Sequence, residues 1–112
     1  MDVVKLKRFD VYWVNLDPTI GSEIKKTRPV VIISPDSMNF SRLKTIIVAP
    51  MTSTVRDNFP TRVNTTFKNK AGQIALDQLR GIDRSRILQK LGSVDKETEN
   101  AILNILTIMF QR

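Results

Sequence analysis

Hydrophobic and polar positions form short blocks along most of the chain, a pattern typical of β-strands. The clearest blocks are 29–34 and 45–49, where adjacent branched aliphatic residues predict strands that are covered on both faces. A third strand is predicted for 9–16, which is rich in β-branched and aromatic residues. Proline, aspartate and glycine follow these blocks and favour turns. The first half of the chain therefore predicts three strands.

The second half of the chain predicts three further strands. A polar loop at 53–61 precedes a weaker strand at 62–67, which we expect at the edge of the sheet. Alternating apolar residues predict a strand at 72–79. The short segment 88–94 is expected to pair with that strand across a turn at 81–87.

The C-terminal segment has the period of a helix. Asp95 is a plausible N-cap, and Glu97 and Glu99 suit the positive end of a helix dipole. Apolar residues then recur at helical spacing, at Ala101, Ile102, Ile105, Leu106, Met109 and Phe110. The pattern predicts an α+β fold that is mostly β. We expect a single domain over 1–112, with about six short antiparallel strands curled into a small sheet or barrel and one C-terminal helix.

The amino-acid composition limits which catalytic and metal-binding chemistries are possible. The 112 residues include no cysteine and no histidine, which excludes disulfides, thiol catalysis, a Ser-His-Asp triad and His- or Cys-ligated metals. Lys and Arg number 18 against 11 Asp and Glu, a net charge of +7, as expected for a protein with a polyanionic partner.

Nothing in the sequence predicts a targeting signal or a membrane span. The longest apolar run, 30–33, is far too short to cross a bilayer. We therefore expect a cytoplasmic protein without a membrane partner.

Polar residues gather at the long loop 17–28, which carries Glu23, Lys25, Lys26 and Arg28. Loops of this length are often functional, although a solvated hairpin would look the same. Arg28 directly precedes Pro29 and a buried strand, so its backbone is held rigidly. A fixed guanidinium suits a phosphate, with a surface salt bridge as the alternative.

Two further places carry candidate contacts. Thr52 and Ser53 follow an aliphatic strand and could contact a phosphate or a ribose, or simply form a turn. Asp77 and Gln78 interrupt a hydrophobic strand, where Asp is unusual. They could contact a base edge or an arginine, or protect a sheet edge from aggregation.

Other polar and aromatic residues favour plainer interpretations. The aromatic residues Phe9, Tyr12 and Trp13 are expected in the core. Scattered cations are expected on a solvated face, at Lys68, Lys70, Arg80, Arg84, Arg86 and Lys90.

The order of several segments resembles the MazF/PemK toxin family. They are DVYWVNLDP at 10–18, GSE at 21–23, TRPVVIIS at 27–34, VAPMTS at 48–53, LDQLR at 76–80, ID at 82–83 and the amphipathic C-terminal segment. The resemblance implies a curled SH3-like antiparallel barrel and a homodimer. It also implies metal-independent, cofactor-free cleavage of single-stranded RNA at short motifs, and neutralisation by an antitoxin, which the positive charge predicts to be acidic.

The resemblance also implies roles for individual residues. Arg28 and Thr52 match the catalytic arginine and threonine, and Glu23 matches the acid of the Gly-Ser-Glu segment. Ser53 and Gln78 fall at positions expected near RNA, and Asp77 at an acidic position that only some members use. Further RNA contacts are expected from Lys25, Lys26 and Arg80.

This set is chemically sufficient for RNA cleavage, because RNA supplies its own nucleophile, the 2′-OH. Arg28 can hold the non-bridging oxygens, Thr52 can donate a hydrogen bond, and Glu23 is the obvious candidate base. Two alternatives differ in class. A nucleic-acid-binding barrel without catalysis would share the fold and charge, and a topoisomerase poison of the same fold would need a C-terminal tryptophan, whereas the only tryptophan is Trp13.

Overall fold

A computed structural model of the chain describes residues 5–16 and 27–112. Within these ranges the elements are β1 (Asp10–Asn15), β2 (Thr27–Ile32), α1 (Asp36–Asn39), β3 (Thr45–Thr52), β4 (Arg62–Phe67), β5 (Lys70–Ala75), the 3-10 turn η1 (Leu76–Gln78), β6 (Arg80–Asp83), the 3-10 turn η2 (Arg84–Arg86), β7 (Ile87–Ser93) and α2 (Lys96–Phe110). Glu23, Lys25 and Lys26 lie outside the described residues. Over the described part, no helix has the length and apolar character needed to span a bilayer.

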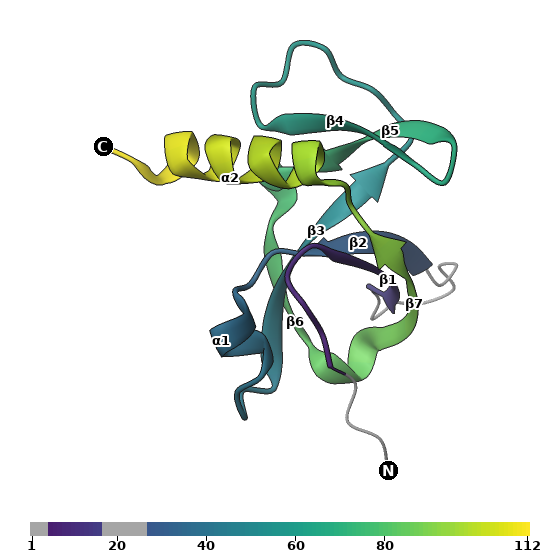
Figure 1. The fold of residues 1–112 in the computed structure, drawn as a ribbon, viewed down its shortest axis with the longest axis vertical. Helices are drawn as coiled ribbons and strands as arrows, with labels where there is room; N and C mark the ends of the chain where they lie inside the picture. The colour runs from purple at the N-terminus through teal and green to yellow at the C-terminus, as the bar shows by residue number, and fades with distance from the viewer. Residues whose placement is uncertain (1–4, 17–26) are drawn as a thin grey trace, which may run out of the picture.

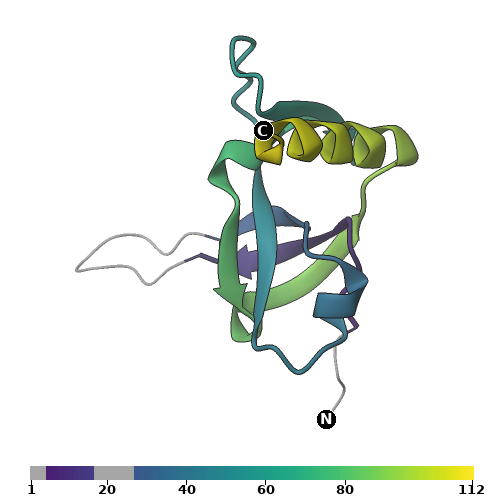
Figure 2. The same cartoon turned by 90° about the vertical axis from the view of Figure 1, so that its left-hand side faces the viewer.

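The strands form one curled antiparallel sheet in the order β4-β5-β3-β2-β1-β7, and β6 also pairs with β3. On one side, β3 pairs with β2. On the other, its first half pairs with β6 and its last two residues pair with β5. Figures 1 and 2 show the resulting half-barrel, with α2 lying across one end beside β4. The predicted fold class, a mostly-β α+β barrel with a C-terminal helix, is confirmed, and 62–67 is an edge strand as predicted.

Residues 30–33, the second half of β2 and the residue after it, are covered on both faces, as their unbroken aliphatic run predicts. Val30 and Ile32 face the inside of the curl, where they pack with Tyr12, Val14 and Val48. Val31 and Ile33 face the opposite way, into a second cluster that includes Ile102 of α2. Because successive side chains alternate across a strand, β2 contributes to both cores at once.

Helix α2 begins at the predicted cap. The Asp95 carboxylate accepts a hydrogen bond from the Thr98 N–H at 2.8 Å, which satisfies a backbone donor in the first turn. Ile102 is fully buried, and Ile105, Leu106 and Met109 pack against the same core. The apolar stripe of the helix therefore covers its own sheet.

The prediction of one strand over 72–79 is wrong. β5 ends at Ala75, and η1 turns the chain so that β6 starts at Arg80. Both strands pair with the same edge of β3, but η1 lies between them and shifts the register, from Met51 opposite Ile74 to Val48 opposite Arg80. The predicted pairing of 72–79 with 88–94 is also wrong, because β7 pairs with β1, and the expected turn at 81–87 contains most of β6.

The prediction that Trp13 belongs to the core is also wrong. Phe9 and Tyr12 are buried, but Trp13 is 37% exposed. Tyr12 and Val14 face the inside of the curl, so Trp13 points to the other side of the sheet. The core on that side includes Val11 but not Trp13.

Candidate nucleic-acid interface

Arg28 and Thr52 lie at adjacent strand ends on the same face of the sheet. Val30 of β2 pairs with Pro50 of β3, and Ile32 pairs with Val48. Continuing this antiparallel register by two residues places Arg28 opposite Thr52. Because side chains repeat every second residue, both share the face of Val30 and Val48, the inside of the curl. The Arg-Pro segment and the hydroxyl-bearing end of β3 therefore meet at one rim of the half-barrel.

This rim opens into a cavity of about 190 Å³, named here the arginine cavity. Its lining side chains are Arg28, Pro50, Thr52, Thr54, Arg56, Arg62, Ala75 and Gln78. Three arginine residues therefore line a small space to which no described carboxylate contributes, and one of them, Arg62, is paired with Asp77. Because guanidinium groups match the oxygens of a phosphate, the cavity suits an anion.

Arg62 is held in place by Asp77. Its Nε donates to Asp77 Oδ1 at 2.8 Å, and Thr61 Oγ1 donates to the same oxygen at 3.0 Å. The Arg62 side chain is only 8% exposed. The hydrogen bond from Arg62, supported by that from Thr61, lowers the pKa of Asp77 below its ordinary value of 3.8. Asp77 thus contacts an arginine, one of its two predicted functional uses, and does not itself line the cavity.

Replacing Asp77 with asparagine is expected to lower the melting temperature at neutral pH by a few degrees. A carboxyl whose pKa is lower in the folded chain stabilises the fold above its ordinary pKa and loses this effect as pH falls through the folded value. The difference between the two proteins should therefore shrink in acid. Thermal unfolding followed by circular dichroism from neutral pH to the acid range measures it, with Asp57→Asn as the control at an exposed carboxylate. A constant difference across this range would contradict the assignment.

The Thr52 hydroxyl is oriented by its own turn. Its Oγ1 accepts a hydrogen bond from the Thr54 N–H at 3.1 Å, which leaves the hydroxyl hydrogen as a donor. The adjacent strand β5 approaches closely, because a Cβ on Gly72 would lie 2.6 Å from the Thr52 carbonyl oxygen. Glycine at 72 therefore allows the close approach that fixes the end of β3.

A second cavity of about 490 Å³ continues from the first and shares Arg28, Thr52 and Thr54 with it. Its other lining residues include Pro29, Ser53, Phe67, Lys70 and Gly72, and again no carboxylate from the described part of the chain. Besides the shared residues, the ring of Phe67, the cation of Lys70 and several small residues give this cavity a lining that is partly apolar and partly charged, which suits a nucleoside. The two cavities form a positively charged groove of the size of a short nucleic-acid segment.

The other predicted contact residues divide between the groove and the rest of the surface. Gln78 lines the arginine cavity and Ser53 the second one, whereas Arg80 lines neither. Of the scattered cations, Lys70 reaches the groove. Three others have partners within the chain, since Arg84 and Arg86 donate to backbone carbonyls and Lys90 pairs with Asp10.

Sequence reasoning missed Thr54, Arg56 and Arg62. Arg56 lies in the loop before β4, and its backbone N–H donates to Gln73 Oε1 at 2.9 Å. Gln73 is 2% exposed, so this bond ties the loop to β5. The one available signal was an arginine at the start of a strand that otherwise carries small residues, which is too common to single out Arg62.

The fold and sequence match known proteins over nearly the whole chain. Endoribonuclease EndoA of Bacillus subtilis (strain 168) is 36% identical over 109 residues, 92% of each chain. Endoribonuclease MazF of Staphylococcus saprophyticus is 38% identical over 106 residues, 87% of this chain and 88% of that one.

Among solved structures, a MazE–MazF crystal structure from Deinococcus radiodurans aligns with a TM-score of 0.79 at 22% identity, over 96% of both chains. A second, of MazF alone from the same organism, aligns with a TM-score of 0.76. At this identity the structures support the fold. The family of PemK-like, MazF-like toxins of type II toxin–antitoxin systems matches residues 7–110. The chain therefore belongs to the PemK-like, MazF-like toxins.

Proposed function

We propose that this chain is an endoribonuclease that cleaves single-stranded RNA at short motifs without a metal or other cofactor, and that it acts as a growth-inhibiting toxin in the cytoplasm. The observation that carries the proposal is the arginine cavity, where Arg28 and Thr52 meet beside Arg56 and Arg62. The two curated relatives described above are named endoribonucleases. An acidic antitoxin is the expected neutralising partner, because the chain carries a net charge of +7.

The proposed reaction uses the RNA's own 2′-OH as nucleophile. The base removes the proton of the 2′-OH, whose oxygen attacks the adjacent phosphorus, and the bond to the 5′ oxygen of the next nucleotide breaks. That oxygen takes up a proton from the protonated base or from water, so the products are a 2′,3′-cyclic phosphate and a 5′-hydroxyl. Arg28 would stabilise the charge that develops on the phosphorane oxygens, and Thr52 would donate a further hydrogen bond. Arg62, fixed by Asp77, would position the phosphate. Glu23 remains the proposed base, and lies outside the described residues.

Cleavage is expected to survive excess EDTA. The chain has no histidine or cysteine, and no group of three acidic side chains that could hold a metal occurs in the described part. The measurement is incubation of purified protein with a long RNA in EDTA, followed by mapping of the cut ends. RNA that stays intact with and without added magnesium would instead indicate a nucleic-acid-binding barrel without catalysis. Cleavage that requires magnesium would contradict the proposed chemistry.

A homodimer is also part of the proposal. One candidate for the interface is part of the helix face with Ile102, Ile105, Leu106 and Met109, or an adjacent sheet face. The structure packs these four residues on the chain's own core. Apolar side chains instead remain exposed elsewhere on α2, at Leu103, Ile108 and Phe110, which is 73% exposed. The helical period places Leu103 and Phe110 on one flank of the core-facing stripe and Ile108 on the other. Exposed apolar side chains of this kind suit an interaction surface.

We expect a dimer mass in light scattering at micromolar concentration and a shift toward monomer in Ile108→Glu, because a buried unpaired charge opposes association. Asn100→Glu introduces the same charge at an exposed polar position of the same helix and should leave the mass unchanged. A monomeric mass for the unaltered protein would contradict the dimer. A dimer mass in Ile108→Glu would show that Ile108 lies outside the interface.

A further inference from the structure

A further cavity among the described residues lies away from the groove. It has a volume of about 850 Å³, and none of the residues that line it lines the arginine cavity or its neighbour. It is named here the basal pocket. Lys44, at its edge, directly precedes β3, whereas Thr52 ends the same strand. These two ends of β3 are roughly 23 Å apart at the usual rise of a strand. The basal pocket is therefore a separate surface.

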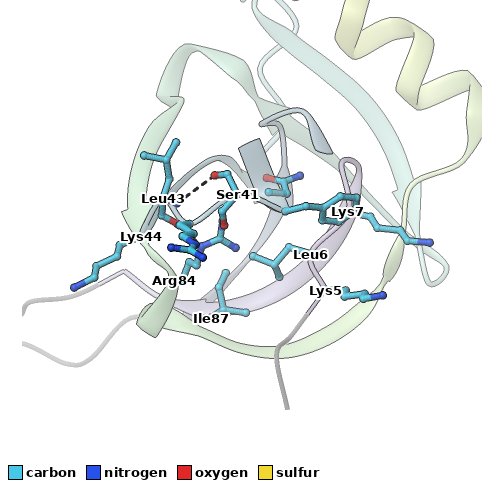
Figure 3. Close-up of a pocket in the computed structure, with 11 residues that line it drawn as sticks. Lys5, Leu6, Lys7, Ser41, Leu43, Lys44, Arg84 and Ile87 are labelled. Carbon is cyan, nitrogen blue, oxygen red and sulfur yellow. Dashed lines mark hydrogen bonds between the residues drawn. The ribbon is translucent and has the colours of Figure 1, made fainter. Parts of the chain in front are cut away.

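The basal pocket combines an apolar floor with a cationic rim. The apolar lining residues are Leu6, Phe40, Leu43 and Ile87, and the side chains of Phe40 and Leu43 are 57% and 55% exposed. Lys5, Lys7, Arg42 and Lys44 supply the rim, and no carboxylate among the described residues lines the pocket. Figure 3 shows Leu6 and Ile87 directed toward the middle of the pocket, with Lys44 extending outward at its edge.

The wall of the basal pocket is fixed before any ligand arrives. Arg84 donates to the backbone carbonyl of Met38 in α1 at 3.2 Å, and to those of Leu43 at 2.6 Å and Ser41 at 3.4 Å in the loop between α1 and β3. Its own backbone N–H also donates to the Lys44 carbonyl at 2.8 Å. One arginine thus holds the loop that carries Phe40 and Leu43. A surface that is already ordered loses little conformational entropy on binding.

The charge of the rim and the types of residue that line the basal pocket together indicate which kind of ligand it binds. An anionic ligand complements a rim of four cations. Single-stranded RNA is recognised mainly by stacking of its bases on aromatic or guanidinium planes. The floor offers one ring among three aliphatic side chains, and of the two arginines that line the pocket, Arg84 is held by backbone carbonyls. Aliphatic floors suit the apolar side chains of a peptide instead. We propose that the basal pocket binds an acidic peptide segment, with one apolar side chain inserted over Leu6 and Ile87 and carboxylates on the cationic rim.

Such a contact holds a protein partner at the end of β3 that is remote from Arg28 and Thr52. The chain belongs to a family of toxin–antitoxin systems, so a partner with acidic segments is chemically expected. The bound peptide leaves the groove open. The inference concerns binding alone and does not depend on RNA cleavage.

The test uses a fluorescent acidic peptide in which a single leucine is flanked by aspartates and glutamates, with binding to the full chain followed by anisotropy. The double substitution Arg42→Glu/Lys44→Glu should weaken binding at least about tenfold at low salt, and higher salt should reduce the difference. The matched control is Lys96→Glu/Arg112→Glu, which makes the same change in net charge at exposed positions outside the pocket. Changing the leucine of the peptide to alanine should weaken binding about fivefold to tenfold, as expected for loss of a buried apolar side chain.

Three results would overturn the inference. Equal weakening by the pocket and control substitutions would show general charge attraction. If Arg42→Glu/Lys44→Glu lost affinity for a labelled single-stranded RNA while its peptide binding stayed unchanged, the basal pocket would be identified as an RNA contact. A shift of Phe40→Ser/Leu43→Ser from dimer to monomer in light scattering would identify this face as an interface between copies. Circular dichroism and melting temperature identify any variant that fails to fold. If a variant fails, the leucine-to-alanine change in the peptide still tests the inference, because it is measured with the unaltered protein.

Discussion

Replacing Arg28 with alanine is expected to reduce RNA cleavage at least about 100-fold and to leave the fold intact. The side chain faces the arginine cavity from the end of β2, where it has no role in either hydrophobic core. The charge that develops on the phosphorane oxygens would lose its nearest planar donor. Because Arg56 and Arg62 line the same cavity, RNA binding should fall less than the rate, so kcat should fall more than KM rises.

Arg28→Lys tests whether charge alone is sufficient. A lysine keeps the charge but offers no planar fork, so it should not restore cleavage. Arg112→Ala, at an exposed terminal position, is the matched control and should cleave like the unaltered protein. Full activity in Arg28→Lys would reduce the role of Arg28 to charge attraction. Inactivity of Arg28→Ala accompanied by a collapsed melting temperature would refute the catalytic assignment.

An RNA with a single deoxyribose on the 5′ side of the scissile phosphate should not be cleaved detectably. The substitution removes the nucleophile and leaves nearly every phosphate and base in place. Binding should therefore persist, apart from a modest loss if the missing hydroxyl is itself contacted. The modified RNA should act as a competitive inhibitor of cleavage of the unmodified RNA. Gel analysis of cleavage, together with a titration of the inhibitor, measures both effects.

The chemical nature of the ends completes this experiment. With the unmodified RNA, the products should carry a 2′,3′-cyclic phosphate and a 5′-hydroxyl. Cleavage of the deoxy-substituted RNA at the same bond, or a 5′-phosphate on the product, would make water the nucleophile. Such a result would require a new assignment of roles for Arg28, Thr52 and Glu23, although the groove itself would remain a binding site.

Local patterns were sufficient for most of the sheet. The aliphatic run that begins at Val30 predicts a strand buried on both faces, because no polar position alternates within it, and both faces are indeed packed. The cap at Asp95 and the helical period after it predict α2 in the same way. The strand prediction over 72–79 was wrong because the alternation of apolar and polar residues continues through the 3-10 turn η1. The predicted pairing was wrong because this alternation carries no information about which strand is the partner.

Only part of the candidate site could be predicted from the sequence. Arg28 was found because proline and a buried strand follow it, and Thr52 because hydroxyl residues follow an aliphatic strand. Arg56 and Arg62 carry no such signal. They become candidates only when the register of β3, β4 and β5 brings them to the same cavity. Asp77 looked like an unusual strand residue, and the structure shows it as the partner of Arg62.

The sequence by itself determined the class of the fold, the excess of positive charge, and the absence of histidine and cysteine from any chemistry the protein performs. Composition follows directly from the residue types, and the hydrophobic period depends only on residues that are near one another in the chain. The tertiary structure decided which cations meet in a groove, which are held by backbone carbonyls, and which surround the separate basal pocket. Those distinctions depend on strand pairing between residues far apart in the chain, and a single sequence does not record that pairing.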